Sequence, residues 1–242
     1  MIFATSTLIL YQDTSLIAVD KPAGIAVIPG RGEPPESCLK AVVELELKER
    51  EGGAARLWVV HRLDRDVSGV LVFARNAAAH RELSMAFEHA QVAKSYWALV
   101  EGVVKDDEGL IDLPLRTGGH GGKTVVDPRL GKDSRTRYRV RQRFAGHTVV
   151  EAEPLTGRTH QIRVHLRALG HPLAVDRRYG NRAVLYASEL RGQAPLPGEA
   201  PLVSRATLHA ERLVLPRGED KLVLTSPLPG DLAAALAILA AS

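Results

Sequence analysis

The sequence predicts an α+β protein in which short strands and a few helices share one core. The chain opens with short apolar runs separated by tight turns such as Lys21-Pro22-Ala23-Gly24, which is typical of neighbouring strands in a sheet. Over residues 135–144 arginine alternates strictly with other residues, and this period of two predicts an antiparallel strand with one arginine face. Capping residues such as Asn76 precede stretches with helical spacing.

Short apolar runs give the positions of the remaining strands. They are expected at residues 8–11, 16–20, 25–28, 57–60, 70–74, 93–100, 110–115, 148–153 and 208–215. Because the runs at 57–60 and 70–74 are apolar and β-branched, both should be buried. The polar residues between these two strands interrupt a buried region, which usually indicates a functional role.

Four helices are expected. The first is capped by Ser37, runs to about residue 50 and ends at Gly52-Gly53, and the second runs from the Asn76 cap to about residue 91. A third follows the turn at Thr156-Gly157 and ends at Gly170, and an apolar terminal helix covers residues 231–241. At 100° per residue, the third helix separates a core face from a polar face. The core face holds Ile162, Leu166 and Leu169, and the polar face holds His160, Arg163 and Arg167.

Length and composition indicate one domain spanning residues 1–242. Apolar residues make up 45% of the chain, enough for a single continuous core. The N-terminus lacks the layout of a signal peptide, and no apolar run approaches the roughly 20 residues that cross a bilayer. We therefore expect a cytoplasmic monomer without membrane contact. The lone cysteine, Cys38, excludes an internal disulfide and a thiolate metal cage, and its expected place is buried in a helix.

Positive charge is concentrated in one part of the chain. The formal net charge is only +4, yet residues 129–182 contain twelve arginines and one lysine against four acidic residues. Such a concentration suits a surface that meets a polyanion, and the excess of arginine over lysine suits forked contacts to phosphate. Nucleic acid is therefore the favoured partner.

The polar segment between the two buried strands contains a candidate nucleophile. Its sequence, residues 61–69, is HRLDRDVSG, so that Asp64 has Arg62 two residues before it. An arginine neighbour keeps a carboxylate ionised when it is partly desolvated, because the opposite charge offsets the burial penalty. Asp64 could then act as a nucleophile, or it could simply cap a turn or form an ion pair.

Five segments in order resemble the RluA-type RNA pseudouridine synthases. HRLDRDVSG resembles the pattern HRLDxxTSG, and KSYWALVEG at residues 94–102 is similar to KxYxAxVxG. LTGRTHQIRVHLRALGHPLAVDRRYG at residues 155–180 resembles GRTHQIRVHLxxxGHPxxGDxxYG. The opening ILYQDTSLIAVDKPAG and the late Leu208-His209-Ala210 match as well. These segments cover nearly the whole chain, and an ordered set of this kind does not arise by chance.

The resemblance implies a fold, a reaction and a set of roles. The fold is a mixed, mostly antiparallel sheet flanked by helices and loops, with the active-site cleft across it. The reaction breaks the N-glycosidic bond of a uridine in ribosomal or transfer RNA, rotates the uracil and rejoins it through C5 without a cofactor or metal. Asp64 is the catalytic aspartate, and Arg62 reorganises the RNA around the extruded base. Tyr96 lies against the uracil and can remove the sugar C2′ proton, and Arg163 pairs with Asp64.

The chain departs from the family pattern in three respects. Val67 stands where the signature usually has threonine, which removes a hydroxyl from the catalytic loop, and Ala174-Val175 replaces the usual small residues before Asp176. The chain also begins at the catalytic domain, so no S4-like RNA-binding domain is expected in front of it. RNA affinity must then come from the catalytic domain itself, which favours a compact stem-loop of ribosomal or transfer RNA as the partner.

The alternating arginines are the first candidates for that affinity. Alternate strand positions lie about 6.7 Å apart, similar to the spacing of phosphates along RNA, but such a face could equally be paired with acidic neighbours. A glycine-rich loop at residues 118–122 should be mobile, and with Lys123 and Lys132 it could close over RNA or form an ordinary hairpin tip. The full set of expected RNA-binding residues is Arg62, Arg65, Arg137, Arg139, Arg141, Arg158, His160, Lys123 and Lys132.

Three other classes of protein compete with this interpretation. A metal-dependent hydrolase needs a compact ligand set, whereas His160 and His165 lie about 140° apart around a helix. A glycosidase could use Asp64 and Asp66, but three basic residues surround them and aromatic residues form only 5% of the chain. A non-catalytic RNA-binding protein would keep the basic face and gain nothing from Asp64, so replacement of Asp64 separates it from an enzyme.

Overall fold

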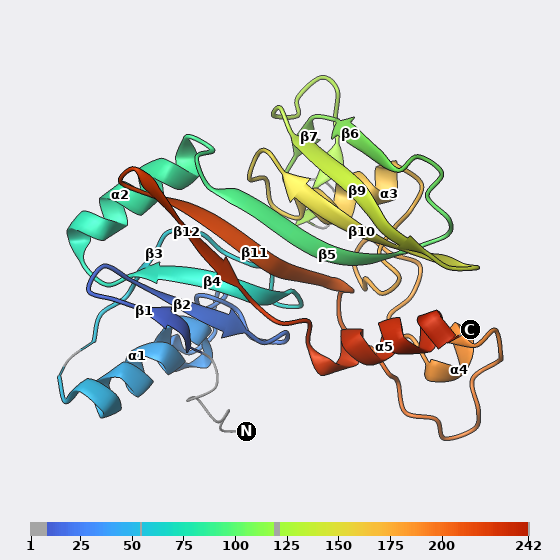
Figure 1. The fold of residues 1–242 in the computed structure, drawn as a ribbon, viewed down its shortest axis with the longest axis horizontal. Helices are drawn as coiled ribbons and strands as arrows, with labels where there is room; N and C mark the ends of the chain where they lie inside the picture. The colour runs from blue at the N-terminus through green and yellow to red at the C-terminus, as the bar shows by residue number, and fades with distance from the viewer. Residues whose placement is uncertain (1–8, 54, 119–121, 242) are drawn as a thin grey trace. The chain divides into compact units, whose positions relative to one another are not determined.

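The computed structural model describes residues 9–53, 55–118 and 122–241, which form two compact units (Figure 1). The first unit contains the chain up to Ala93 together with Ala210–Pro227. The second contains Lys94–His209 and the chain from Leu228 onward. Both units combine strands with helices, and every strand pair of described register is antiparallel. The expected α+β class with a mostly antiparallel sheet is confirmed, whereas the single domain and the cleft across the sheet stay predictions.

Antiparallel strands form the centre of the first unit. They are β1 (Ile9–Gln12), β2 (Leu16–Lys21), β3 (Trp58–Val59), β4 (Ser68–Ala74), β12 (Asp220–Thr225) and the part of β11 (Leu208–Arg217) from Ala210 on. The order is β1-β2-β4-β11, with β3 beside β4 and β12 beside β11. Val70 and Val72 of β4 pack with Leu83 of α2 (Ala77–Glu88) and Leu213 of β11 in one apolar cluster. This core holds both ends of the segment that contains Asp64.

Two helices of the first unit begin where local hydrogen bonds favour them. The Asn76 side chain accepts from the Ala79 amide and caps α2, as predicted. Ser37 does not cap α1 (Leu39–Glu51), because its hydroxyl donates to the Pro34 carbonyl within the 3-10 turn η2 (Pro35–Ser37). Cys38 is the N-terminal cap residue of α1 instead, and it is buried as expected. Gly52, at φ 73°, ends the helix.

The strand expected at residues 25–28 is not formed. The carbonyls of Ala26 and Val27 accept hydrogen bonds from the amides of Leu39 and Lys40, at the start of α1. The apolar side chains of this segment still reach the core, since Val27 is buried. Its carbonyls therefore accept hydrogen bonds from the free amides in the first turn of a helix rather than from a neighbouring strand.

A four-stranded antiparallel arrangement forms the second unit, in the order β5-β10-β9-β6. Its strands are β5 (Ala93–Glu101), β6 (Glu108–Asp112), β9 (Arg135–Arg143) and β10 (His147–Pro154), with a separate hairpin of β7 (Leu115–Arg116) and β8 (Val125–Val126). Its helices are α3 (Gln161–Ala168), α4 (Ala187–Leu190) and α5 (Gly230–Ala241). Trp97, Val149 and Leu232 join one apolar cluster from β5, β10 and α5. The amphipathic strand at 135–144 is confirmed.

Some features differ from the sequence predictions. The strands β8 and β12 and the short helix α4 were not predicted, and the run at 110–115 divides between β6 and β7. The predicted strand at 8–11 begins, in the described chain, at Ile9, and the glycine-rich loop falls partly on residues 119–121, outside the described residues. Among the helices that the structure describes, none is both long enough and apolar enough to cross a bilayer.

Candidate active site

Asp64 lies in an irregular segment between β3 and β4, at the start of a turn. The Val67 amide donates to the Asp64 carbonyl at 3.1 Å, which closes the turn, and Asp64 itself is half-buried. Leu63 and Val67 on either side are buried. These two buried side chains anchor the segment on either side of the half-buried Asp64. Val67, which replaces the usual threonine, thus serves as part of the core.

A buried lysine holds the backbone around Asp64. The Lys21 side chain is 0% exposed, and its ammonium donates to the carbonyls of Pro22, Arg65 and Val67 at 2.8, 3.0 and 2.8 Å. The Gly24 amide adds a second donor to the Arg65 carbonyl at 2.8 Å. Since charged donors make the stronger hydrogen bonds, Lys21 fixes the turn from inside the protein.

Gly69 allows the end of this segment to approach another backbone closely. A Cβ at this position would lie 2.2 Å from the carbonyl oxygen of Ala210, and the φ of Gly69 is 121°. Both conditions require glycine. His61 is also structural, because its Nε2 accepts from the Val72 amide at 3.0 Å and its ring stacks on Phe87. These contacts hold the backbone of the segment 61–69, which carries both Asp64 and Asp66.

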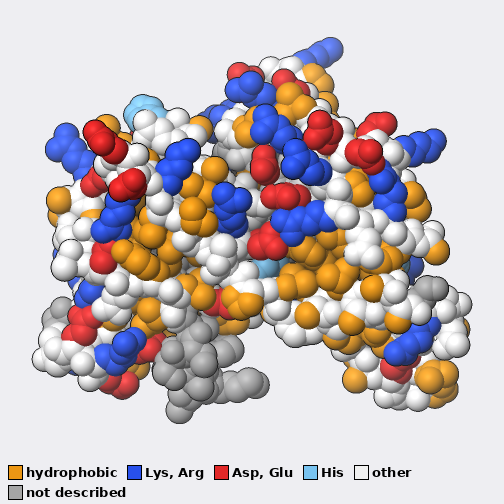
Figure 2. Space-filling model, in the orientation of Figure 1, with side chains coloured by type: hydrophobic (Ala, Val, Ile, Leu, Met, Phe, Trp, Pro, Cys, Tyr) orange, Lys and Arg blue, Asp and Glu red, His pale blue; other side chains and the backbone are white. Residues whose placement is uncertain are grey.

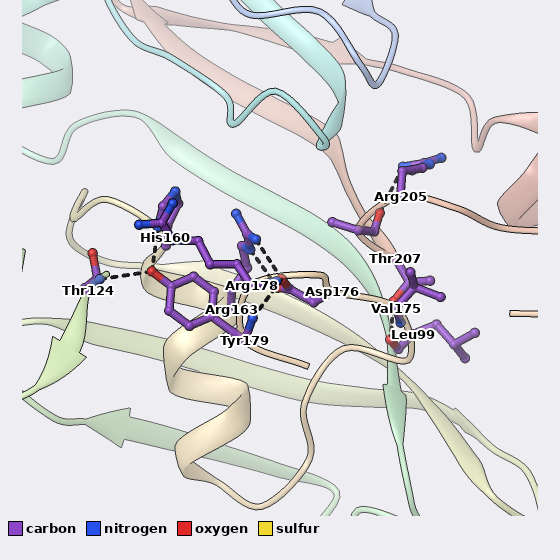
Figure 3. Close-up of polar contacts among 11 residues, drawn as sticks. Leu99, Thr124, His160, Arg163, Val175, Asp176, Arg178, Tyr179, Arg205 and Thr207 are labelled. Atoms are coloured by element: carbon purple, nitrogen blue, oxygen red, sulfur yellow. Dashed lines mark hydrogen bonds and ion pairs between the residues drawn. The ribbon is translucent and has the colours of Figure 1, made fainter. Parts of the chain in front are cut away.

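In the second unit, Tyr96 and Arg163 are both buried. Tyr96 is 9% exposed on β5, where it pairs with Ala152 of β10. Arg163 is 6% exposed on α3, and its Nε and Nη2 donate to Oδ2 and Oδ1 of Asp176, both at 2.7 Å (Figure 3). Burial raises the pKa of Asp176, but the hydrogen bonds and charge of Arg163, together with hydrogen bonds from the Arg178 and Tyr179 amides, outweigh burial and hold this pKa below its ordinary value.

Tyr179 and His160 complete the surroundings of Arg163. The Arg163 guanidinium carbon lies 5.0 Å from the centre of the Tyr179 ring, a cation–π contact. The Tyr179 hydroxyl accepts from the Thr124 amide at 3.0 Å and lies 2.7 Å from Nδ1 of His160. His160 precedes α3 in the left-handed conformation, at φ 57°, so it is not on the polar helix face where the sequence placed it. Arg167 is exposed, whereas Arg163 is buried.

The comparisons with known proteins identify the family. Residues 15–168 match the family model described as RNA pseudouridylate synthase. The chain belongs to the RNA pseudouridylate synthase family. The members of this family are RNA uridine isomerases. The matched region of this chain contains the half-buried Asp64 segment and the buried Tyr96 and Arg163.

Curated relatives and solved structures agree with this family. The chain is 39% identical to the ribosomal large subunit pseudouridine synthase D of Nitrosomonas europaea, over 94% of this chain and 64% of that protein. It is 37% identical to the synthase C of Vibrio cholerae, over 94% of this chain and 68% of that one. The chain thus spans about two thirds of their length. The solved human RNA pseudouridylate synthase domain containing 4 is 28% identical, with a TM-score of 0.80 over 98% of this chain and 94% of that one.

Family membership leaves the residue roles as predictions. Asp64 belongs to the first unit, and Tyr96 and Arg163 belong to the second. The expected pairing of Arg163 with Asp64 stays a prediction. Asp176 and Tyr179, which contact Arg163, and Lys21, which holds the backbone of the Asp64 turn, were not predicted from the sequence. A signal for Asp176 was present, since it follows the apolar run 173–175 and a buried carboxylate needs a cation.

The expected RNA-binding arginines of β9 all have acidic neighbours. We call Arg137, Arg139 and Arg141 the arginine row; their side chains are on one face of β9 and contact, in turn, Glu153 of β10, Glu108 of β6 and Glu151 of β10. The nitrogen–oxygen distances are 3.2–3.4 Å. Figure 2 shows blue and red side chains interleaved over this part of the surface. The face is therefore close to charge balance rather than strongly basic.

Other expected RNA-binding residues lie on loops. Arg62 is exposed beside Asp64, and Arg65 pairs with Glu33. A group that we call the loop cations, Lys123, Lys132 and Arg158, is exposed in the second unit. The Arg158 Nε donates to the carbonyl of Asp133, next to Lys132, at 3.2 Å. This contact holds two of the three loop cations near each other on one loop surface.

His165 has a structural role in the second unit. Its Nδ1 lies 2.8 Å from the Thr136 hydroxyl and its Nε2 lies 3.0 Å from the Leu113 carbonyl. Burial lowers the pKa of His165, in spite of the Leu113 contact, which raises it. Within the described ranges 9–53, 55–118 and 122–241, no group of three or more His, Cys, Asp or Glu side chains is placed to hold a metal ion.

Proposed function

We propose that this protein converts uridine to pseudouridine in RNA, with Asp64 as the nucleophile. The observation that carries the proposal is the Asp64 turn. It lies in the region that matches the family, its backbone is fixed by the buried Lys21, and Asp64 itself is half-buried. A carboxylate held in a fixed backbone can meet a reacting carbon without reorganising first, which lowers the barrier to attack.

The proposed reaction conserves all atoms of the nucleotide. The Asp64 carboxylate attacks C1′ of the target uridine, which forms an ester bond, breaks the N-glycosidic bond and frees the uracil to rotate. Tyr96, which packs against the uracil, takes the sugar C2′ proton as the bond between Asp64 and C1′ breaks, and returns this proton to C2′ as C5 of uracil bonds to C1′. The hydrogen on C5 is then lost as a proton while N1 gains one. Arg163 pairs with the Asp64 carboxylate.

Base flipping accounts for the other residues of the site. A uridine in a stem must leave the helix before its C1′ and C5 can be reached, and flipping needs an aromatic surface for the base and a cation for the backbone. Tyr96 provides the aromatic surface, and the exposed Arg62 provides the cation. The loop cations contact neighbouring phosphates, and Arg65 and His160 also contact the RNA.

Ribosomal RNA, transfer RNA or both supply the substrate. The names of the relatives in Nitrosomonas europaea and Vibrio cholerae refer to the ribosomal large subunit, which favours a ribosomal RNA stem-loop for this chain. The protein acts as a monomer in the cytoplasm and uses no cofactor. Conversion in the presence of a chelator tests the last point, since restoration of a lost activity by one metal would contradict it.

The test measures tritium released from C5-labelled uridine in single-turnover reactions. The substrates are unmodified transcripts of ribosomal and transfer RNA. Asp64→Asn should reduce release by several powers of ten, because the amide is nearly the same size but supplies no anionic nucleophile. RNA affinity should change far less, since other cations provide it. Asp66→Asn is the matched control, with the same change two residues away in the same turn region.

Three outcomes separate the candidate functions. Loss of release in Asp64→Asn, with near-normal release in Asp66→Asn, supports the proposal. Normal release from a folded Asp64→Asn variant excludes this residue as the nucleophile. RNA binding by a wild-type protein that releases no tritium from any transcript favours a non-catalytic RNA-binding protein.

A further inference from the structure

We propose that Asp176 is a positioning residue that fixes the Arg163 guanidinium for the reaction at Asp64. The inference rests on the proposed function and adds a residue to it. Asp176 touches neither substrate nor nucleophile in this proposal; it acts through Arg163. Four features of the second unit support it: the geometry of the ion pair, the anchoring of Asp176, the link to β5, and the contact with Tyr179.

The ion pair between Asp176 and Arg163 determines how the guanidinium is oriented. Nε and Nη2 donate to separate carboxylate oxygens, both at 2.7 Å, so the carboxylate and guanidinium lie side by side (Figure 3). Two parallel hydrogen bonds fix rotation as well as position. Asp176 uses the Nε edge of the guanidinium, so a second carboxylate that pairs with Arg163 must approach from the side of Nη1.

Asp176 is itself anchored by its own backbone surroundings. Oδ1 accepts from the amides of Arg178 and Tyr179 at 2.9 and 3.0 Å, and the Asp176 side chain is 1% exposed. The Asp176 amide donates to the Arg182 carbonyl, and the Gly180 amide donates to the Asp176 carbonyl. A Cβ on Gly180 would come within 2.9–3.1 Å of Asp176 atoms, so this turn closes around Asp176. These contacts therefore hold the Asp176 carboxylate in one orientation.

The residues before Asp176 connect it to the strand that carries Tyr96. The Ala174 amide donates to the Leu99 carbonyl of β5 at 2.9 Å. The Thr207 hydroxyl accepts from the Val175 amide and donates to the same Leu99 carbonyl (Figure 3). These contacts set Asp176 in register with β5. Asp176, and through it Arg163, is thus connected to the strand that carries Tyr96, the other proposed catalytic residue of this unit.

Tyr179 supports the guanidinium from its face. The ring lies 5.0 Å from the guanidinium carbon, and the hydroxyl is held by the Thr124 amide and by His160. Asp176 thus binds one edge of the Arg163 guanidinium, and the Tyr179 ring packs against it. A side chain with several rotatable bonds is reduced to one orientation, which is the arrangement expected of a preorganised site.

A second ion pair in the same unit provides the matched control. Arg205 donates Nε and Nη2 to the two oxygens of Asp231, both at 2.8 Å, in the same side-by-side geometry. Arg205 has no place in the proposed mechanism. If the pairs serve stability alone, Asp176→Asn and Asp231→Asn should affect the reaction alike. If Asp176 positions Arg163, only Asp176→Asn should slow it.

The experiment measures single-turnover tritium release at saturating enzyme, RNA dissociation constants and thermal unfolding, on the transcript that wild type modifies. Asp176→Asn should lower the rate per folded molecule by roughly 10–100-fold, as for other residues that orient a reacting group, with the dissociation constant changed less than about threefold. Asp231→Asn should leave both within about threefold. Asp176→Glu, which restores the carboxylate, should recover part of the lost rate.

A measurement without substrate tests the positioning directly. The ¹⁵N-labelled Nε–H of Arg163, assigned with Arg163→Lys, should be protected from solvent exchange in wild type. Asp176→Asn should remove this protection, and Asp231→Asn should leave it. If Asp176→Asn does not fold, Tyr179→Phe decides, because it removes the hydroxyl contacts and keeps the ring. Its rate should fall by a few-fold.

The outcomes distinguish this inference from the proposed function. A folded Asp176→Asn variant with the wild-type rate and a protected Arg163 Nε–H overturns the inference and leaves the proposed function intact. Wild-type rates for Asp176→Glu and Tyr179→Phe, should Asp176→Asn not fold, overturn it as well. A wild-type protein that releases no tritium overturns both proposals.

Discussion

Lys21→Met should lower the free energy of unfolding by about 3 kcal/mol, the balance between three lost hydrogen bonds and the relieved cost of burying an ammonium. The ammonium is fully buried and donates to three backbone carbonyls. A hydrogen bond from a charged donor contributes about 1.5–3 kcal/mol, and a buried acceptor left unpaired costs about 1–3 kcal/mol. Methionine keeps the apolar stem and removes the cost of burying an ammonium, so part of this loss is offset.

Denaturant unfolding of wild type and Lys21→Met measures this difference. Lys48→Met is the control, because Lys48 is exposed on α1 and its replacement should change the free energy of unfolding by less than about 0.5 kcal/mol. The rate of tritium release should also fall in Lys21→Met, since the carbonyls of Arg65 and Val67 belong to the turn beside Asp64. A loss below about 1 kcal/mol would show that water replaces the ammonium and would refute the reasoning.

Three further predictions follow from the described contacts. Replacement of all three loop cations by alanine should weaken RNA binding at least tenfold and flatten its salt dependence. Replacement of the three residues of the arginine row should have a smaller effect on both. Equal slopes of RNA affinity against salt concentration for the two triple variants would contradict this prediction. In denaturant unfolding, Gly69→Ala should destabilise the protein by more than about 3 kcal/mol. Gly146→Ala is the control, because no atom lies within 4 Å of a Cβ at this position, and it should destabilise the protein by less than about 1 kcal/mol. Because the pKa of Asp176 in the folded protein lies below its ordinary value of 3.8, ionised Asp176 stabilises the fold at pH values above 3.8. Acidification through the folded pKa removes this stabilisation. The free energy of unfolding, measured as the pH is lowered below 4, should therefore change less for Asp176→Asn than for wild type.

The accuracy of the sequence predictions depended on how local each interaction is. The cap at Asn76 involves an amide three residues away, and the alternation at 135–144 reflects one strand, so both were predicted correctly. The segment at 25–28 is apolar like a strand, but its carbonyls meet the start of α1, which the segment itself does not encode. The acidic partners of the arginine row come from β6 and β10, and their register was not available from the sequence.

The candidate site shows the same limit. Asp64, Tyr96 and Arg163 were found because each lies in a motif, and the structure leaves their roles as proposals. Lys21 and Asp176 were not singled out, because each is defined by partners distant in the chain. Lys21 meets Val67, 46 residues away, and Asp176 meets Arg163, 13 residues away. A buried charge in a sequence indicates that a partner exists without saying which one.

The division of the chain into units has a consequence for its synthesis. Residues 210–227 return to the first unit after more than a hundred residues in the second, and the second unit is completed only by α5. A ribosome releases a chain from its N-terminus, so β4 emerges long before β11, the strand beside it in the sheet. The first unit cannot finish folding until residues 94–209 of the second have been made, and the second waits in turn for α5. A nascent chain stopped before residue 210 would expose the unpaired edge of β4, a site where chaperones bind and aggregation begins.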